Sequence, residues 1–73
     1  MSNSVRYNYN MKTWTPKQIK ALRKKNNISQ IKLGELLGVT TNYVYLLEKG
    51  VKEPSKTLTL LLDCVEEKLK KGE

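Results

Sequence analysis

Residues 29–50, SQIKLGELLGVTTNYVYLLEKG, constrain the fold more than any other part of the chain. The first half of the segment has apolar residues at the i, i+3, i+4 spacing of a helix with one buried face, namely Leu33, Leu36 and Leu37. Gly38 interrupts this pattern, and a second short helical pattern follows and ends at Gly50. Each pattern is preceded by a hydroxyl residue suited to a helix N-cap, Ser29 and Thr40 respectively. The segment therefore predicts two short helices, over residues 29–37 and 40–49, joined by a tight turn.

Two further helices are predicted on either side of this segment. The stretch TWTPKQIKALRKKNN predicts a first helix, because Thr15 can cap it and Pro16 suits its first turn. Asn26 and Asn27 are expected to end that helix, since asparagine tolerates the left-handed conformation. A last helix is expected over residues 55–71, with its apolar side chains on one stripe. The stripe is formed by Leu58, Leu61, Leu62, Val65 and Leu69.

Composition limits the classes of function that are open to the chain. It has 73 residues and a net charge of +7, so we expect one small domain that attracts polyanions. Residues 1–34 hold eight basic and no acidic residues, which concentrates that attraction in the N-terminal half. Cys64 is the only cysteine and histidine is absent, so the sequence predicts no intrachain disulfide, no metal site and no cofactor. With no glycine-rich phosphate loop either, an enzyme is not expected.

The location of the protein is also predicted from composition. The longest apolar run, residues 60–62, is too short to cross a membrane, and the N-terminal residues lack the apolar segment of a signal peptide. A single cysteine is typical of a reducing compartment. We therefore expect a cytoplasmic protein without a membrane partner.

The spacing within residues 29–50 resembles a helix-turn-helix, whose second helix enters the major groove of DNA. Residues 15–69 as a whole resemble the lambda-repressor/Cro type of helix-turn-helix domain, the XRE family. The residues that match its pattern are Ser29, Gln30, Gly34, Gly38, Val39, Thr40, Val44, Glu48, Gly50 and Pro54. This resemblance implies an all-α, lambda-repressor-like domain of about four to five short helices, with residues 40–49 as the recognition helix. The chain is also similar to small regulators of phage and mobile elements and to antitoxins.

The resemblance assigns structural and DNA-binding roles to residues of this chain. It implies an ion pair between Arg23 and Glu48, which would join the first helix to the end of the third. It also implies that Gly34, where the family usually carries alanine, lies at a close crossing of the second and third helices. Contacts with the DNA backbone are expected from polar and basic groups at the ends of the two motif helices. These groups are Gln30, Lys32, Thr40, Lys49 and Lys52.

The base-contacting face of the recognition helix is expected to lie opposite the side that faces the core. If Val44, Leu47 and Glu48 face inward, the opposite face and its flanks hold the candidate base-contacting residues, namely Thr41, Asn42, Tyr43 and Leu46. Asn42 can pair with adenine, and the other three can press carbon atoms against thymine methyl groups. We therefore expect an operator half-site that favours A·T pairs.

Residues 1–14 do not continue the helical pattern, and we assign them to an N-terminal arm that precedes a domain over residues 15–73. Within the arm, apolar and polar residues alternate with the period of two typical of a strand; the apolar members are Val5, Tyr7, Tyr9 and Met11. Three interpretations remain open. The arm is disordered, lies along DNA as a basic segment, or forms a strand that pairs with its copy in a dimer.

The expected function is that of a repressor that binds a palindromic operator in double-stranded DNA as a homodimer, with half-sites about 34 Å apart. Leu60 and Cys64 lie at i, i+4 on a face adjacent to the apolar stripe of the last helix, and belong either to the core or to a dimer seam. A cysteine of this kind is typically a small buried hydrophobe. One alternative is an antitoxin that binds a toxin and also represses its own operon. Another is a helix-turn-helix that makes only protein contacts.

Overall fold

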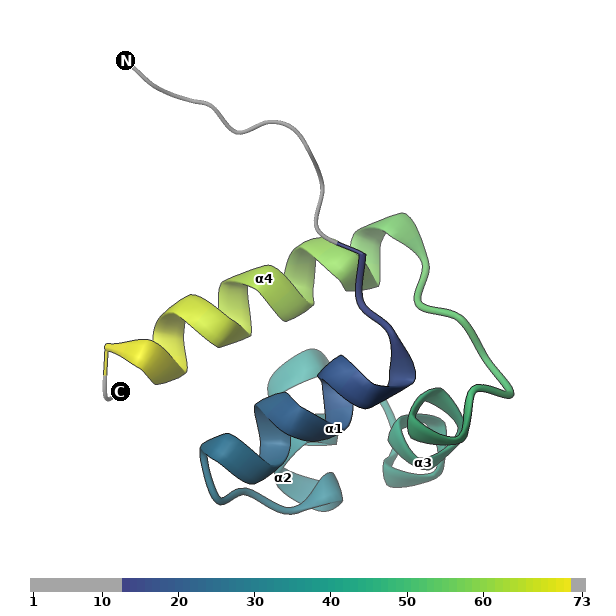
Figure 1. Ribbon diagram of the computed structural model, residues 1–73, viewed down its shortest axis with the longest axis horizontal. Coiled ribbons are helices and arrows are strands. Elements are labelled where there is room, and N and C mark those ends of the chain that lie inside the picture. The colour runs from purple at the N-terminus through teal and green to yellow at the C-terminus, as the bar shows by residue number, and fades with distance from the viewer. Residues whose placement is uncertain (1–12, 72–73) are drawn as a thin grey trace.

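The computed structural model describes residues 13–71, and this part of the chain folds into four α-helices without strands (Figure 1). They are α1 (Pro16–Lys25), α2 (Gln30–Leu37), α3 (Thr41–Lys49) and α4 (Lys56–Lys70). Figure 1 shows α4 running along one side of the other three helices. The predicted all-α fold is confirmed, whereas the proposals for residues 1–12 lie outside the described residues. None of the described helices has the length and apolar character that crossing a membrane requires.

The sequence sets where each helix begins. Thr15 caps α1 and forms a capping box with Gln18, in which each side chain bonds to the other residue's backbone amide. The other three helices begin in the same way, with a hydroxyl oxygen that accepts a hydrogen bond from the amide three residues later. These caps are Ser29, Thr40 and Ser55.

The turns that end the first three helices use the left-handed backbone conformation. Asn27 has a φ of 56°, and the glycines at the ends of α2 and α3, Gly38 and Gly50, have φ of 75° and 80°. Glycine adopts this region without the steric cost that a Cβ atom brings, and asparagine tolerates it better than most residues. These three residues therefore separate the four helices at the positions that the sequence predicts.

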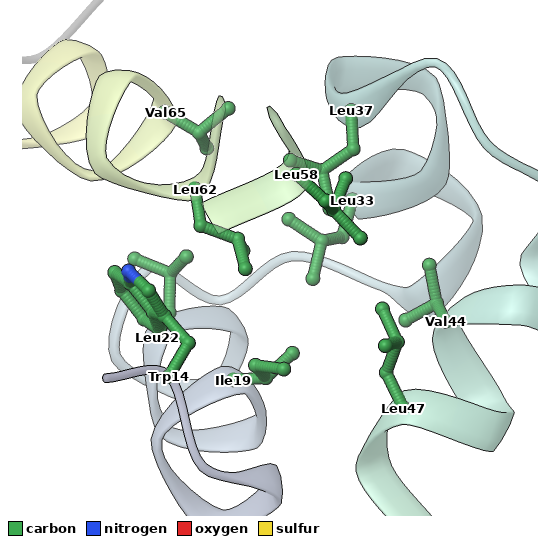
Figure 2. Packing of buried hydrophobic residues seen from close by; sticks show 10 residues of the cluster. All are labelled: Trp14, Ile19, Leu22, Leu33, Leu37, Val44, Leu47, Leu58, Leu62 and Val65. Atoms are coloured by element: carbon green, nitrogen blue, oxygen red, sulfur yellow. The ribbon is translucent and has the colours of Figure 1, made fainter. Parts of the chain in front are cut away.

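A single apolar core lies between the four helices. Figure 2 shows its side chains converging from α1, α2, α3 and α4 toward the centre of the domain. Ile19, Leu33, Val44, Leu47 and Leu62 are fully enclosed. The remaining members are Trp14, Leu22, Leu37, Leu58 and Val65. Because every helix contributes to this one core, the position of α3 depends on all of the others.

Trp14 belongs to this core, so its predicted place in the N-terminal arm is wrong. Its side chain is only 4% exposed, and its indole Nε1 donates a hydrogen bond of 2.8 Å to Oδ1 of Asp63 in α4. The hydrogen bond satisfies the polar atom of an otherwise apolar ring, which is what a buried tryptophan needs. The packed part of the chain thus begins before the first helix.

The apolar stripe of α4 is narrower than the sequence predicts. Leu58, Leu62 and Val65 are buried and Leu69 packs against them, but Leu61 is 38% exposed. At about 100° per residue, Leu61 lies roughly 70° from the centre of the buried stripe, so the prediction that it faces the core is wrong. Cys64 is exposed as well, which corrects the prediction of a small buried hydrophobe.

Gly34 lies at the close crossing of α2 with the start of α3. A Cβ atom at this position would be 2.8 Å from the backbone oxygen of Val39, closer than a carbon and an oxygen can approach without displacement. That oxygen belongs to the turn between the two helices and cannot rotate away as a side chain would. The absence of a side chain therefore fixes how closely the two helices pack.

We predict that Gly34→Val lowers the free energy of unfolding by about 2 kcal/mol, because overpacking against fixed backbone outweighs any gain in helix propensity. The matched control is Glu35→Val, which places the same side chain at the next, exposed position of α2 and should change stability by less than about 0.5 kcal/mol. Denaturant unfolding of both variants measures the difference. Equal stabilities would show that the crossing tolerates a side chain.

Candidate nucleic-acid interface

The exposed face of α3 is the candidate surface for a nucleic acid. Val44 and Leu47 hold this helix in the core, and Tyr43 packs partly against it. The side chains on the opposite side reach solvent; they are Thr41, Asn42, Tyr45 and Lys49. This face combines a hydroxyl, an amide, a phenol and an ammonium group, so it can donate and accept hydrogen bonds along most of its length.

The predicted base-contacting residues do not all share this face. Thr41 and Asn42 are exposed at its start, but Tyr43 and Leu46 are half-buried. Tyr45, which is not among the predicted base-contacting residues, is 47% exposed. If Val44, Leu47 and Glu48 define the buried side of α3, the opposite, exposed side includes Leu46, as predicted. If Tyr43, Val44 and Leu47 define the buried side, the spacing of 100° per residue places Tyr45 on the exposed side in its place.

The predicted backbone-contacting residues lie at the ends of the motif helices. Gln30 and Lys32 are in the first turn of α2, and Thr40 caps α3. Lys49 is the last residue of α3, and Lys52 follows in the exposed loop before α4. All except Gln30 are exposed. Lys49 and Lys52 therefore place positive charge near the C-terminal end of α3, where the helix dipole is negative.

Arg23 and Glu48 form the ion pair that the resemblance implies. The Nε and Nη2 atoms of Arg23 donate to the two carboxylate oxygens of Glu48 at 2.7 and 2.9 Å. Side-chain exposure is 13% for Arg23 and 5% for Glu48, so the pair is largely shielded from water. The Nε2 atom of Gln30 adds a third hydrogen bond to Oε1 of Glu48, at 3.2 Å. One carboxylate therefore joins α1, the start of α2 and the end of α3.

The pair shifts the protonation equilibria of both partners. Burial alone would raise the pKa of Glu48, but hydrogen bonds from Arg23 and Gln30 and the charges of Arg23 and Lys20 outweigh it and lower the pKa below its usual value. The hydrogen bond to Glu48 raises the pKa of Arg23, against an opposing effect of burial. Both groups therefore stay charged near neutral pH.

The proposed dimer seam lies on the side of α4 that faces away from the core. Leu60 is 51% exposed and Cys64 is exposed one turn later. Leu61 and Tyr43 line a shallow apolar groove of about 470 Å³ between α4 and the turn that joins α2 to α3. Leu60 and Cys64, which are predicted to belong either to the core or to a dimer seam, are thus both exposed on one face of α4.

The comparison with family models matches residues 19–62 to the family described as helix-turn-helix. The matched range starts within α1, includes α2 and α3, and ends within α4, so it covers more than half of the chain. The curated proteins and the solved structures gave no match to the chain.

We predict that Glu48→Ala lowers the free energy of unfolding by about 3 kcal/mol, because it leaves Arg23 shielded and unpaired. The value lies at the lower end for a buried pair because the partly exposed Arg23 can regain water. Glu67→Ala is the control, since Glu67 pairs with Lys70 at 4.0 Å on the open surface and should lose less than about 0.5 kcal/mol. Similar losses in the two variants would contradict a structural role for the Arg23–Glu48 pair.

The lowered pKa of Glu48 also predicts a dependence of stability on pH. Its contribution is fully present above the unfolded-state pKa of about 4.3 and is lost as the pH falls through the lower folded-state pKa. The stability difference between the wild type and Glu48→Gln should therefore be constant above about pH 5 and shrink toward zero in more acidic solution. Denaturant titrations of both proteins at several pH values measure it. A difference that stays constant down to pH 2 would argue against a charged Glu48 in the folded state.

Proposed function

The chain belongs to the XRE-type, lambda-repressor-like family of helix-turn-helix domains, and on this basis we propose that it represses transcription by binding a palindromic operator in double-stranded DNA as a homodimer. Domains of this family bind DNA and are typically non-catalytic. The observation that carries the proposal is the exposed polar face of α3, which a shared core and a shielded ion pair hold in a fixed orientation. A fixed helix with free polar groups is what contact with base edges in the major groove requires.

Base selection is assigned to the start of α3. The side-chain amide of Asn42 can donate to N7 and accept from N6 of adenine, and the methyl group of Thr41 can lie against a thymine methyl. Both residues are exposed in the first turn, where a recognition helix approaches the bases most closely. Tyr43 and Leu46 retain partial exposure and can add apolar contacts at the edges of the helix. The proposed half-site accordingly favours A·T pairs.

Affinity is assigned to the basic and polar groups around the motif. Lys32 lies in the first turn of α2, Lys49 is the last residue of α3, and Lys52 follows in the loop before α4. The amides that open α2 and the side chain of Gln30 can bind a phosphate at the positive end of that helix. Neutralising DNA phosphates releases counterions, so binding should weaken steeply as salt increases.

A dimer supplies the specificity that one small domain lacks. A two-fold axis requires the same surface on both copies, and the exposed side of α4 with Leu60 and Cys64 is the seam that we propose. The neighbouring groove beside Leu61 could accept an apolar side chain from the second copy. The two recognition helices would then contact half-sites about 34 Å apart.

A second candidate is an antitoxin that binds a toxin and represses its own operon with the same domain. The observation in its favour is the exposed apolar surface of α4, which has room for a protein partner beside α3. A helix-turn-helix used only for protein contacts would use that surface alone. Binding of the pure protein to DNA separates that last possibility from the other two, and co-purification with a small partner identifies an antitoxin.

The decisive experiment is a binding selection from randomised duplex DNA at stated salt concentrations. We expect inverted half-sites rich in A·T pairs, spaced by about one helical turn, with affinity that falls as salt rises. Asn42→Ala should relax selection at one base pair and weaken binding by about 1–3 kcal/mol. Lys52→Ala should instead weaken binding to all sequences. It should also lower by about one the number of counterions released on binding, which is read from the salt dependence of the affinity. Motifs dominated by G·C pairs would contradict the assignment of Asn42, and a flat salt response would contradict DNA as the partner.

A further inference from the structure

Tyr45 and Lys49 form a pair on the exposed face of α3 that the assignment of base contacts leaves unused. They follow Thr41 at intervals of four residues, so the three side chains lie in one row along the helix. The ammonium nitrogen of Lys49 is 6.0 Å from the centre of the Tyr45 ring, within the range of a cation–π interaction. The side chain of Lys49 therefore bends back along the helix instead of extending away from it.

The lengths of the side chains in this row increase toward the end of the helix. Thr41 and its neighbour Asn42 are short, so the start of α3 must come close to the bases for either to make contact. Tyr45 lies about 6 Å further along the axis than Thr41, and Lys49 about 12 Å further, at 1.5 Å per residue. A helix that enters the groove by its first turn moves away from the bases over this distance. Its longer side chains then face the sugar-phosphate strand at the edge of the groove.

We propose that Tyr45 and Lys49 together bind one DNA phosphate at the edge of the major groove. The phenol O–H of Tyr45 donates one hydrogen bond to a phosphate oxygen, and the ammonium group of Lys49 donates a second. The tyrosine ring has a further role, because it holds the Lys49 ammonium in place before DNA arrives. This inference rests on the proposed function, which already assigns Lys49 to the DNA backbone, and it adds Tyr45 and the sharing of one phosphate.

The electrostatics of α3 explain why the phosphate needs both groups. Lys49 is the last residue of the helix, where the exposed carbonyl groups give the backbone a partial negative charge that repels a phosphate. The ammonium group places a full positive charge between these carbonyls and the DNA strand. The hydroxyl of Tyr45 donates a hydrogen bond without replacing a counterion on the phosphate. Tyr45 should thus add affinity without adding salt dependence.

The test uses the full chain, a duplex obtained from the randomised selection, and a shuffled duplex of the same composition. Tyr45→Phe keeps the ring and removes the hydroxyl, so it should weaken binding to both duplexes about tenfold with an unchanged salt dependence. Lys49→Met should weaken binding to both duplexes and reduce the salt dependence by about one ion. The double variant should lose less than the product of the two single losses, because both groups bind one phosphate.

The matched control for Lys49→Met is Lys68→Met, the same chemical change on α4. Lys68 is exposed in the last turn of that helix and has no assigned DNA contact, so its variant should bind both duplexes within about twofold of the wild type. Thermal unfolding shows whether each variant retains the fold, which is expected because Tyr45 and Lys49 are exposed.

Three results would overturn the inference, and they are distinguishable from a failure of the proposed function. Unchanged affinity in Tyr45→Phe would show that the hydroxyl does not bind phosphate. A loss in Tyr45→Phe that is confined to the selected duplex would show that Tyr45 contacts a base instead. Independent, multiplicative losses in the double variant would show that the two groups do not share a phosphate. If the wild type selects no DNA sequence and binds neither duplex, the proposed function itself fails.

Discussion

The carboxylate of Glu48 is the point on which the geometry of the DNA-binding motif depends. It accepts hydrogen bonds from Arg23 in α1 and Gln30 in α2, and Glu48 itself is the penultimate residue of α3. Apolar contacts alone let a short helix rotate or slide with little loss, because they have no preferred direction. Three charged or polar hydrogen bonds to one carboxylate do have a direction. They fix the rotation of α3, and therefore which residues reach solvent.

This arrangement has a cost that the small domain must offset elsewhere. Removing two charges from water is unfavourable, and a shielded ion pair often contributes no more stability than apolar residues of the same size. The core that offsets the cost includes Trp14, which closes the space between the start of α1 and α4. Its indole bonds to Asp63, so the segment before α1 is attached to the last helix. The ion pair thus supplies orientation, and the shared core supplies stability.

The sequence predicts the helices well because their ends are set by local chemistry. A hydroxyl before each helix and a glycine or asparagine after α1, α2 and α3 act within a few residues of the chain, so their effect is visible without knowledge of the fold. The faces of the helices depend instead on neighbours that are distant in sequence. Leu61 fits a helical stripe by spacing, but it lines the open groove beside the turn between α2 and α3 and stays 38% exposed. Trp14 shows no periodicity at all, and its burial follows only from the position of α4.

The outward face of α3 is also predicted only in part, because it depends on contacts between residues distant in sequence. The resemblance correctly implies that Glu48 pairs with Arg23, but a paired carboxylate lies at the edge of the buried side, not at its centre. The error is a rotation of about 50°, half of the 100° that separates successive residues, and it replaces Tyr45 by Leu46 on the outward face.

Gln30 extends this reasoning from α3 to the backbone contacts. Its amide nitrogen has two hydrogens, and Glu48 accepts one of them, which leaves the other able to donate to a phosphate at the start of α2. On the proposed function, the contact that positions α3 would then also position a group that binds the DNA strand. A change at Glu48 would disturb the base-contacting helix and the phosphate site together, even though Glu48 itself is shielded from the DNA. On the proposed function, one carboxylate would therefore support both the position of α3 and a group that binds DNA.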